Sequence, residues 1–227
     1  MSRDLHGLVV AVIGASGGLG GELCNVLTKR GCQLLVTSRN GHGLAVADGD
    51  RRVPLSLDLR DSNAGVDLVD QAVAAFGRLD GVINAAGIVA FGNLVDTEDI
   101  VIEELFLTNV LGPLWLARRV LPALGQTKGF FASITGVVAE SPLPGMVPYA
   151  ASKAALSAAL TGLRREARRM GVTVIDARPP HTETGLATRP LAGAAPSMPI
   201  GLSPAAVAER IVVAIENDET EVPSSAF

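Results

Sequence analysis

The chain has 227 residues, of which 48% are hydrophobic and 19% charged, and its formal net charge is −4. This length fits one compact domain better than two, and the negative charge without a basic run argues against nucleic acid as a partner. The longest uncharged stretch, residues 190–208, contains four prolines and is expected to be a loop rather than a membrane span.

Apolar runs alternate with helical patterns along the whole chain. Continuous apolar runs of four to six residues are typical of parallel strands buried on both faces. The expected strands are Leu8–Ile13, Leu34–Thr37, Arg52–Leu57, Gly81–Asn84, Phe130–Thr135 and Val172–Ala177. The expected helices are Leu19–Arg30, Val66–Phe76, Ile100–Leu124, Tyr149–Met170 and one that starts at Ser203-Pro204. This alternation predicts an α/β fold, a single doubly wound parallel sheet with helices on both faces.

Two segments are expected to depart from regular structure. The helix Ile100–Leu124 is expected to bend near Gly112-Pro113, because proline removes a helical hydrogen bond. The Gly/Pro-rich segment 185–201 lacks periodicity and predicts a mobile binding loop ahead of the last helix.

The turn Gly14-Ala15-Ser16-Gly17-Gly18-Leu19-Gly20 joins the first strand to the first helix. Glycine lets the backbone approach a phosphate closely and lets the helix approach the sheet, while the helix N-terminus offers free N–H groups to an anion. We therefore expect this turn to hold the pyrophosphate of a dinucleotide, through Gly14, Ser16, Gly18, Leu19 and Gly20. The alternative is a glycine-rich turn without a ligand.

The end of the second strand indicates which dinucleotide is bound. A site for NAD places an acidic residue there, whereas this chain has Thr37-Ser38-Arg39-Asn40 and no acid before Asp48. Arg39 can pair with a 2′-phosphate and Ser38 can donate a hydrogen bond to it. The sequence therefore predicts NADP(H), with NAD(H) less expected; the alternative for Arg39 is a solvated loop arginine.

Tyr149 and Lys153 lie four residues apart in a predicted helix and so share one helix face. A free tyrosine has a pKa near 10, and a neighbouring lysine charge is expected to lower that pKa toward neutral pH. The pair is therefore suited to proton transfer. The alternative is an ordinary surface pair.

The glycine turn and the Tyr149–Lys153 pair, at these spacings, resemble the short-chain dehydrogenase/reductase family over the whole chain. The resemblance implies a Rossmann fold and an enzyme that interconverts a carbonyl and a secondary alcohol by hydride transfer. Tyr149 would give and take the proton, and Lys153 would also hold the nicotinamide ribose. Asn109 would link Lys153 to solvent through a water molecule; the alternative is a polar residue on the solvent face of a helix.

Further residues match family positions at the cofactor. The resemblance implies contacts to adenine, to the adenosine ribose and to the nicotinamide. Those residues are Asp58 and Leu59 at the adenine, Asn84, Ala85 and Gly87 at the ribose, and Pro179, Thr182 and Thr184 at the nicotinamide.

By the same resemblance, residues 1–100 mainly bind the dinucleotide, 101–184 form the catalytic part, 185–202 the substrate loop and 203–227 the last helix and tail. The substrate pocket is expected from residues 88–94, 137–147 and 181–200, which are mostly apolar and favour an uncharged or hydrophobic carbonyl compound or alcohol. A homodimer is expected, with a homotetramer as the alternative. No metal site is expected.

Two cysteines are too few for a disulfide framework and no signal peptide is visible, so we expect a cytoplasmic protein.

Gly136 is the largest departure from the family, which has a serine at this position to hydrogen-bond the substrate oxygen. Losing one such donor costs about 10²–10³ in rate. Thr135, Ser141, His181 or a water are candidate replacements, although strand alternation turns Thr135 and Ser133 to the opposite face. The alternative function is a dinucleotide-binding regulatory or scaffold protein with little turnover. If the protein is an active oxidoreductase, Gly136→Ser is expected to raise its activity.

Overall fold

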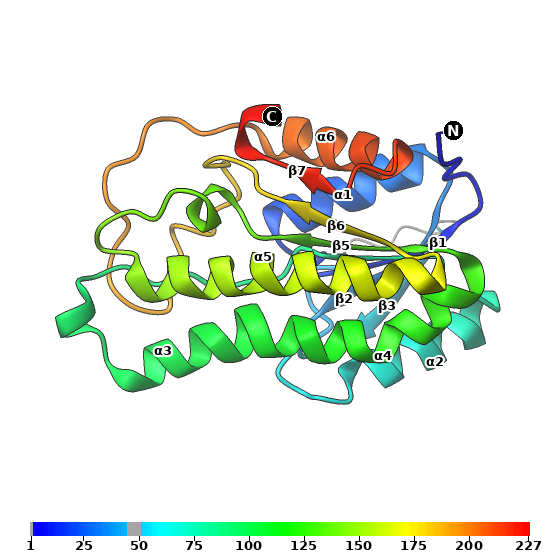
Figure 1. Ribbon diagram of the computed structural model, residues 1–227, viewed down its shortest axis with the longest axis horizontal. Coiled ribbons are helices and arrows are strands. Elements are labelled where there is room, and N and C mark those ends of the chain that lie inside the picture. Colours follow the sequence, from blue (N-terminus) through cyan, green and yellow to red (C-terminus); the bar gives the residue numbers. More distant parts are fainter. Residues whose placement is uncertain (1, 45–50) are drawn as a thin grey trace.

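A seven-stranded parallel sheet forms the centre of the computed structural model, which describes residues 2–44 and 51–227 (Figure 1). Asp48 lies outside the described residues. The sheet order is β3-β2-β1-β4-β5-β6-β7. The strands are β1 (Val9–Ile13), β2 (Gln33–Ser38), β3 (Arg52–Ser56), β4 (Gly81–Asn84), β5 (Phe130–Ile134), β6 (Thr173–Ala177) and β7 (Glu221–Val222).

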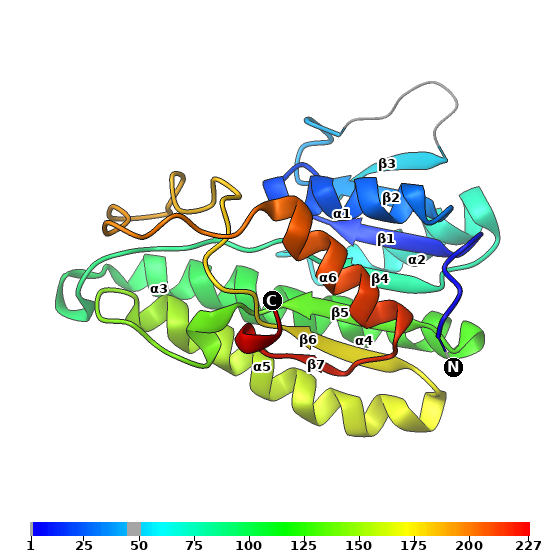
Figure 2. The ribbon, with the colours of Figure 1, turned by 90° about the horizontal axis from the view of Figure 1, so that it is seen from above.

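Helices cover both faces of this sheet (Figures 1 and 2). The helices α1 (Gly18–Lys29) and α6 (Pro204–Glu216) pack on one face. On the other face lie α2 (Ala64–Phe76), α4 (Gly112–Thr127) and α5 (Val147–Ala167). The predicted fold class is therefore confirmed.

Alternation along the strands builds two apolar cores. In β1, Val10 and Val12 face α1 and α6, whereas Val9, Ala11 and Ile13 face the other layer, and all five are buried. Successive side chains of a strand point to opposite faces, so a strand buried on both sides must be apolar throughout. This is why continuous apolar runs predicted buried strands such as β1 and β4; the bounds of all six longer strands, including the partly exposed β3, agree with the prediction to within one residue at each end.

The short strand β7 was not expected from the sequence. It extends the sheet by pairing in parallel with β6, where Glu221 lies opposite Asp176 and Val222 opposite Ala177. Two residues give no periodic signal, so tertiary pairing alone defines this strand.

The predicted helix Ile100–Leu124 is three elements rather than one bent helix. The helix α3 (Asp99–Phe106) passes through a π-helical turn, Leu107–Leu111, into α4. Pro113 near the start of α4 has no amide hydrogen to complete a regular α-helical turn with Asn109, which favours the wider turn at this point. The irregularity therefore lies just before the predicted bend and includes Asn109.

By length and composition alone, the stretch Asp99–Thr127 could cross a membrane, but 44% of its most apolar window is buried within the protein. Leu116, Val120 and Leu124 of α4 lie in the core beneath the sheet. Burial of these side chains in the core accounts for part of the high hydropathy.

The last helix begins as the sequence predicted. Ser203 is the N-cap of α6, and its side chain accepts a hydrogen bond from the amide of Ala206 at 3.2 Å. This satisfies one amide hydrogen of the first turn.

We expect Gly129→Ala to destabilise the protein by about 1–3 kcal/mol, because such overpacking cannot be relieved cheaply. A Cβ on Gly129 would lie 2.1 Å from the backbone oxygen of Asp80. Gly162→Ala in α5 is the matched control, since its Cβ would meet nothing within 4 Å, and it should stabilise the helix by up to about 1 kcal/mol. Urea denaturation checks both values; equal stability of the two variants would contradict the close packing at Gly129.

Candidate active site

A cavity of about 500 Å³ opens at the carboxyl ends of the strands. Because all the strands are parallel, the loops that follow them converge on one edge of the sheet. Predicted site residues from distant parts of the chain therefore meet here. Those that line the cavity are Gly14, Ser16, Gly18, Leu19, Gly20, Ser38, Arg39, Asp58, Leu59, Ala85, Gly87, Tyr149, Lys153, Pro179, Thr182 and Thr184.

The glycine turn is too tight for side chains. Gly14 has φ +80°, and a Cβ there would lie 3.0 Å from the amide nitrogen of Ala86. A Cβ on Gly18 would lie 2.7 Å from the carbonyl oxygen of Thr184, and one on Gly20 would lie 2.1 Å from the carbonyl oxygen of Gly14. The helix α1 starts in this glycine turn, and its N-terminus faces the cavity. Its first helical turn contains no acidic residue, so no side-chain charge there opposes the positive end of the helix dipole. These residues fit a pyrophosphate.

At the far end of the cavity, the ends of β2 and β3 contribute Ser38, Arg39 and Asp58. Ser38 donates its only hydroxyl proton to the carbonyl oxygen of His42 at 2.9 Å, so the hydrogen bond that it was expected to donate to a 2′-phosphate is not made available by this structure. Asp58 forms an ion pair with Arg60, with 2.7 Å between Oδ2 and Nη2, and hydrogen bonds from Arg60 hold the pKa of Asp58 below its usual range. Arg60 itself lines the cavity, and the sequence analysis missed it because a lone arginine after a strand carries no pattern.

Tyr149 and Lys153 lie one turn apart in α5, and both are buried, at 9% and 5% exposed. The Lys153 ammonium donates a hydrogen bond to the carbonyl oxygen of Ile134 at 2.9 Å. A Cβ on Gly87 would lie 3.2 Å from the Lys153 Nζ, so glycine at this position leaves room for the ammonium. Both residues line the cavity, which contradicts the alternative of an ordinary surface pair.

The pKa of Tyr149 departs from its ordinary value in the direction opposite to that expected. Burial raises the pKa of Tyr149 to about 12, because desolvation disfavours the phenolate. Burial also lowers the pKa of Lys153 to about 8, and the charge of Asp176 partly opposes this shift. The predicted lowering of the tyrosine pKa is therefore wrong for this structure, in which the ammonium is hydrogen-bonded to a backbone carbonyl.

Asn109 does not line the cavity and is not on a solvent face, being only 1% exposed. Its Oδ1 accepts a hydrogen bond from the amide of Ile88 at 3.0 Å, and its Nδ2 donates to the Ile88 carbonyl at 2.9 Å and to the Ser152 Oγ at 3.1 Å. The side chain expected to orient a water thus joins the π-helical turn to the loop after β4 and to α5. Its position fixes the surroundings of Lys153.

Asn84 likewise positions a loop rather than lining the cavity. Its Nδ2 donates a hydrogen bond to the Ser133 Oγ at 3.1 Å, and its Oδ1 accepts one from the amide of Ala86 at 3.3 Å. It therefore shapes the backbone of Ala85–Gly87 that the cavity meets.

Gly136 adopts φ +85°, a conformation that side-chain-bearing residues rarely take. This backbone explains the glycine, and it argues against the expectation that Gly136→Ser simply restores a donor. Thr135 donates its only hydroxyl proton to the Asp176 Oδ1 at 2.5 Å, so its hydroxyl is no replacement donor. Ser141 and His181 line the cavity, with 3.2 Å between the His181 Nε2 and the Glu183 Oε1.

The three segments predicted for the substrate pocket all contribute to the cavity wall. Backbone hydrogen bonds fasten the segment 185–201 across it, from the amide of Leu191 to the Val89 carbonyl at 2.7 Å and from the amide of Phe91 to the Ala192 carbonyl at 2.9 Å. The side chains lining this part of the cavity are Ile88, Val89, Phe91, Val137, Val138, Ser141, Leu143, Met146, His181, Leu186, Ala187, Arg189 and Met198.

Comparison with known proteins gives concordant results. The sequence model of the short chain dehydrogenases matches residues 8–192. A short chain dehydrogenase of Pseudocercospora fijiensis is 33% identical over 192 residues, which span 81% of this chain but only 62% of that protein.

Solved structures share the fold over nearly the whole chain. A short chain dehydrogenase from Burkholderia cenocepacia in complex with NADP has a TM-score of 0.87 at 24% identity, covering 98% of this chain and 90% of that one. A short chain dehydrogenase/reductase from Burkholderia phymatum in complex with NAD has a TM-score of 0.88 at 21% identity, with the same coverage. The family match, the sheet order and the residues gathered at its carboxyl edge lead to one conclusion: the chain belongs to the short-chain dehydrogenase/reductase family of oxidoreductases.

Proposed function

We propose that the protein is an NADP(H)-dependent oxidoreductase that interconverts a carbonyl and a secondary alcohol. The observation that carries this proposal is the burial of Tyr149 and Lys153 in the wall of the same cavity that the glycine turn 14–20 lines. The nicotinamide cofactor supplies the hydride acceptor or donor when it is bound. Everything else in the reaction falls to residues of this chain.

The proposed cofactor follows from the charges at the end of β2. Residues 38–44 contain no acid, and Arg39 lines this end of the cavity, where Arg60 is already paired with Asp58. Arginine pairs well with a phosphate, whereas a carboxylate is what a ribose 2′-hydroxyl requires. The two Burkholderia relatives bind NADP in one case and NAD in the other, so the preference rests on this chain's own residues.

The proposed proton chemistry follows from burial. With a pKa of about 12, the Tyr149 hydroxyl is protonated at neutral pH and can give its proton to a carbonyl oxygen during reduction. A nearby lysine charge then favours the phenolate that remains. Because the pKa of Lys153 is about 8, that charge is present at neutral pH and is lost as the pH rises through this value. These are the protonation states that the proposed reduction requires at neutral pH.

A second function, dinucleotide binding with little turnover, is favoured by Gly136 and by the Thr135 hydroxyl, which donates to Asp176. With these two groups removed as donors, Ser141 and His181 are the side chains proposed to bind the substrate oxygen. The wall around them is mostly apolar, which suits an uncharged or hydrophobic substrate. The sequence also predicts a cytoplasmic protein that forms a homodimer or a homotetramer; these stay predictions.

We expect NADPH to bind more tightly than NADH, and Arg39→Ala to weaken NADPH binding by about 10–100-fold while changing NADH binding little, because a charged hydrogen bond is worth about 1.5–3 kcal/mol. Titration of NADPH fluorescence measures this preference. Arg165→Ala, a change at an exposed arginine of α5, is the control. Equal affinity for the two cofactors would contradict the assignment.

We expect Tyr149→Phe to reduce NADPH oxidation by at least about 100-fold, because the general acid is lost, with cofactor binding retained. A panel of aldehydes and ketones assayed with NADPH measures this loss. If the unmodified protein binds NADPH but shows no oxidation that depends on Tyr149, the second function replaces the first.

We expect Gly136→Ser to destabilise the protein by about 1–2 kcal/mol without raising activity, because serine must adopt an unfavourable positive φ. Thermal unfolding and the same carbonyl panel give the two readouts, with Gly162→Ser at an exposed position of α5 as the matched control. A gain in activity at unchanged stability would show that this segment relaxes to accommodate the serine.

A further inference from the structure

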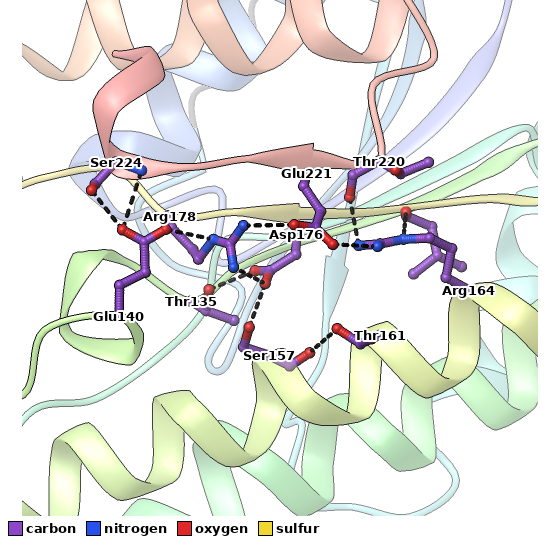
Figure 3. Close-up of polar contacts among 11 residues, drawn as sticks. Thr135, Glu140, Ser157, Thr161, Arg164, Asp176, Arg178, Thr220, Glu221 and Ser224 are labelled. Carbon is purple, nitrogen blue, oxygen red and sulfur yellow. Dashed lines mark hydrogen bonds and ion pairs between the residues drawn. The ribbon is translucent and has the colours of Figure 1, made fainter.

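Asp176 is a buried carboxylate, 1% exposed, near the carboxyl end of β6 (Figure 3). Each of its oxygens accepts a hydrogen bond from a hydroxyl group. The Thr135 Oγ1 donates to Oδ1 at 2.5 Å, and the Ser157 Oγ donates to Oδ2 at 2.6 Å. Arg178 lies further off, with 3.8 Å between its Nη1 and the Asp176 Oδ2. Burying a carboxylate this fully costs desolvation free energy unless other groups compensate for it. The groups that bind Asp176 therefore indicate its role.

Both hydroxyl partners of Asp176 adjoin the groups that hold Lys153. Ser157 follows Lys153 by four residues in α5, so it lies one turn further along the same helix face. Thr135 directly follows Ile134, whose carbonyl oxygen accepts the hydrogen bond of the Lys153 ammonium. A single carboxylate therefore ties the helix that carries Lys153 to the strand end that binds its ammonium.

The charges around Asp176 leave one negative charge unmatched within the cluster drawn in Figure 3. Arg178 pairs with Glu140 at 2.9 Å and with Glu221 at 3.1 Å, and Arg164 pairs with Glu221 at 2.6 Å. Among these described residues, three carboxylates face two guanidinium groups. The negative charge of Asp176 acts on the buried ammonium of Lys153, which lies one helical turn from Ser157.

We propose that Asp176 is a positioning residue of the active site, which fixes α5 and the end of β5 around Lys153 and keeps the Lys153 ammonium charged. The role of Asp176 in catalysis rests on the proposed function, whereas its effect on the charge of Lys153 does not. Asp176 touches neither the cavity nor the reacting groups, and it acts through Lys153 alone.

The direction in which Asp176 shifts the pKa of Lys153 agrees with this geometry. Burial lowers the pKa of Lys153 to about 8, and the negative charge of Asp176 is what opposes the shift. Removing that charge lowers the pKa of Lys153 further, so the ammonium loses its proton at a lower pH than before. The other charged groups of this cluster are Arg164 from α5, Glu140 after β5, Arg178 after β6 and Glu221 from β7, and Tyr149 lies one turn from Lys153 in α5.

The test is direct titration of Lys153, which the composition makes practical. The chain contains three lysines, Lys29, Lys128 and Lys153, so a protein labelled with ¹³C at the lysine ε-carbon gives three resolved groups of NMR signals. The Lys153→Arg variant identifies the Lys153 signal by its disappearance. We expect Asp176→Asn to move the titration midpoint of Lys153 about one pH unit lower, as for loss of a nearby opposite charge.

Two further variants separate charge from structure. Asp80→Asn removes another buried carboxylate, one that pairs with Arg78 at the opposite edge of the sheet, and should leave the Lys153 midpoint unchanged. Asp176→Glu retains the charge and should keep the midpoint near that of the unmodified protein even if stability falls. An unchanged Lys153 midpoint in folded Asp176→Asn, or an equal shift in Asp80→Asn, would overturn the inference.

Activity provides a separate readout. We expect the alkaline limb of the pH profile of kcat/KM for carbonyl reduction to move in the same direction as the Lys153 midpoint in Asp176→Asn. If the midpoint shifts but no carbonyl is reduced, the proposed function fails while the role of Asp176 stands. If Asp176→Asn does not fold, the Asp176→Glu and Ser157→Ala variants carry the test. Both retain the charge of Asp176, so both should leave the titration midpoint of Lys153 unchanged. A midpoint that moves in Ser157→Ala would show that positioning, not charge, sets the titration of Lys153, and would overturn the electrostatic part of the inference.

Discussion

The hydrogen bond from the Lys153 ammonium to the carbonyl oxygen of Ile134 holds a charged group that is only 5% exposed. Such burial is costly unless the surrounding backbone and charges are arranged for it. The strand end at Ile134, the glycine at position 87 and the carboxylate of Asp176 together provide that arrangement. The geometry of the candidate site therefore depends on satisfying one buried cation.

Local patterns in the sequence predict the elements and the main wall of the cavity. The glycine turn 14–20 and the four-residue spacing of Tyr149 and Lys153 are local signals, and in a parallel sheet the topology brings such segments to one edge. The direction of the Tyr149 pKa shift was not predictable in this way, because it depends on how fully α5 is buried. Burial is a property of the assembled layers and not of the spacing within one helix.

Contacts between distant segments could not be read from the chain. Asp176 meets Thr135 and Ser157 across separations of 41 and 19 residues, and no periodicity links the three. The addition of β7 to the sheet is also set by tertiary structure. Sequence reasoning thus located the groups expected to carry the chemistry, and the structure supplied the residues that support them.

The π-helical turn Leu107–Leu111 also sets the rotational phase of everything that follows it. Each residue of an α-helix advances the chain by about 100° around the axis. A π-helical turn closes hydrogen bonds between residues i and i+5, so it accommodates one residue more than an α-helical turn. The extra residue is thereby absorbed without rotating α4 relative to α3, whereas one extra residue in a regular α-helix would turn Leu116 and Val120 by that angle, away from the core.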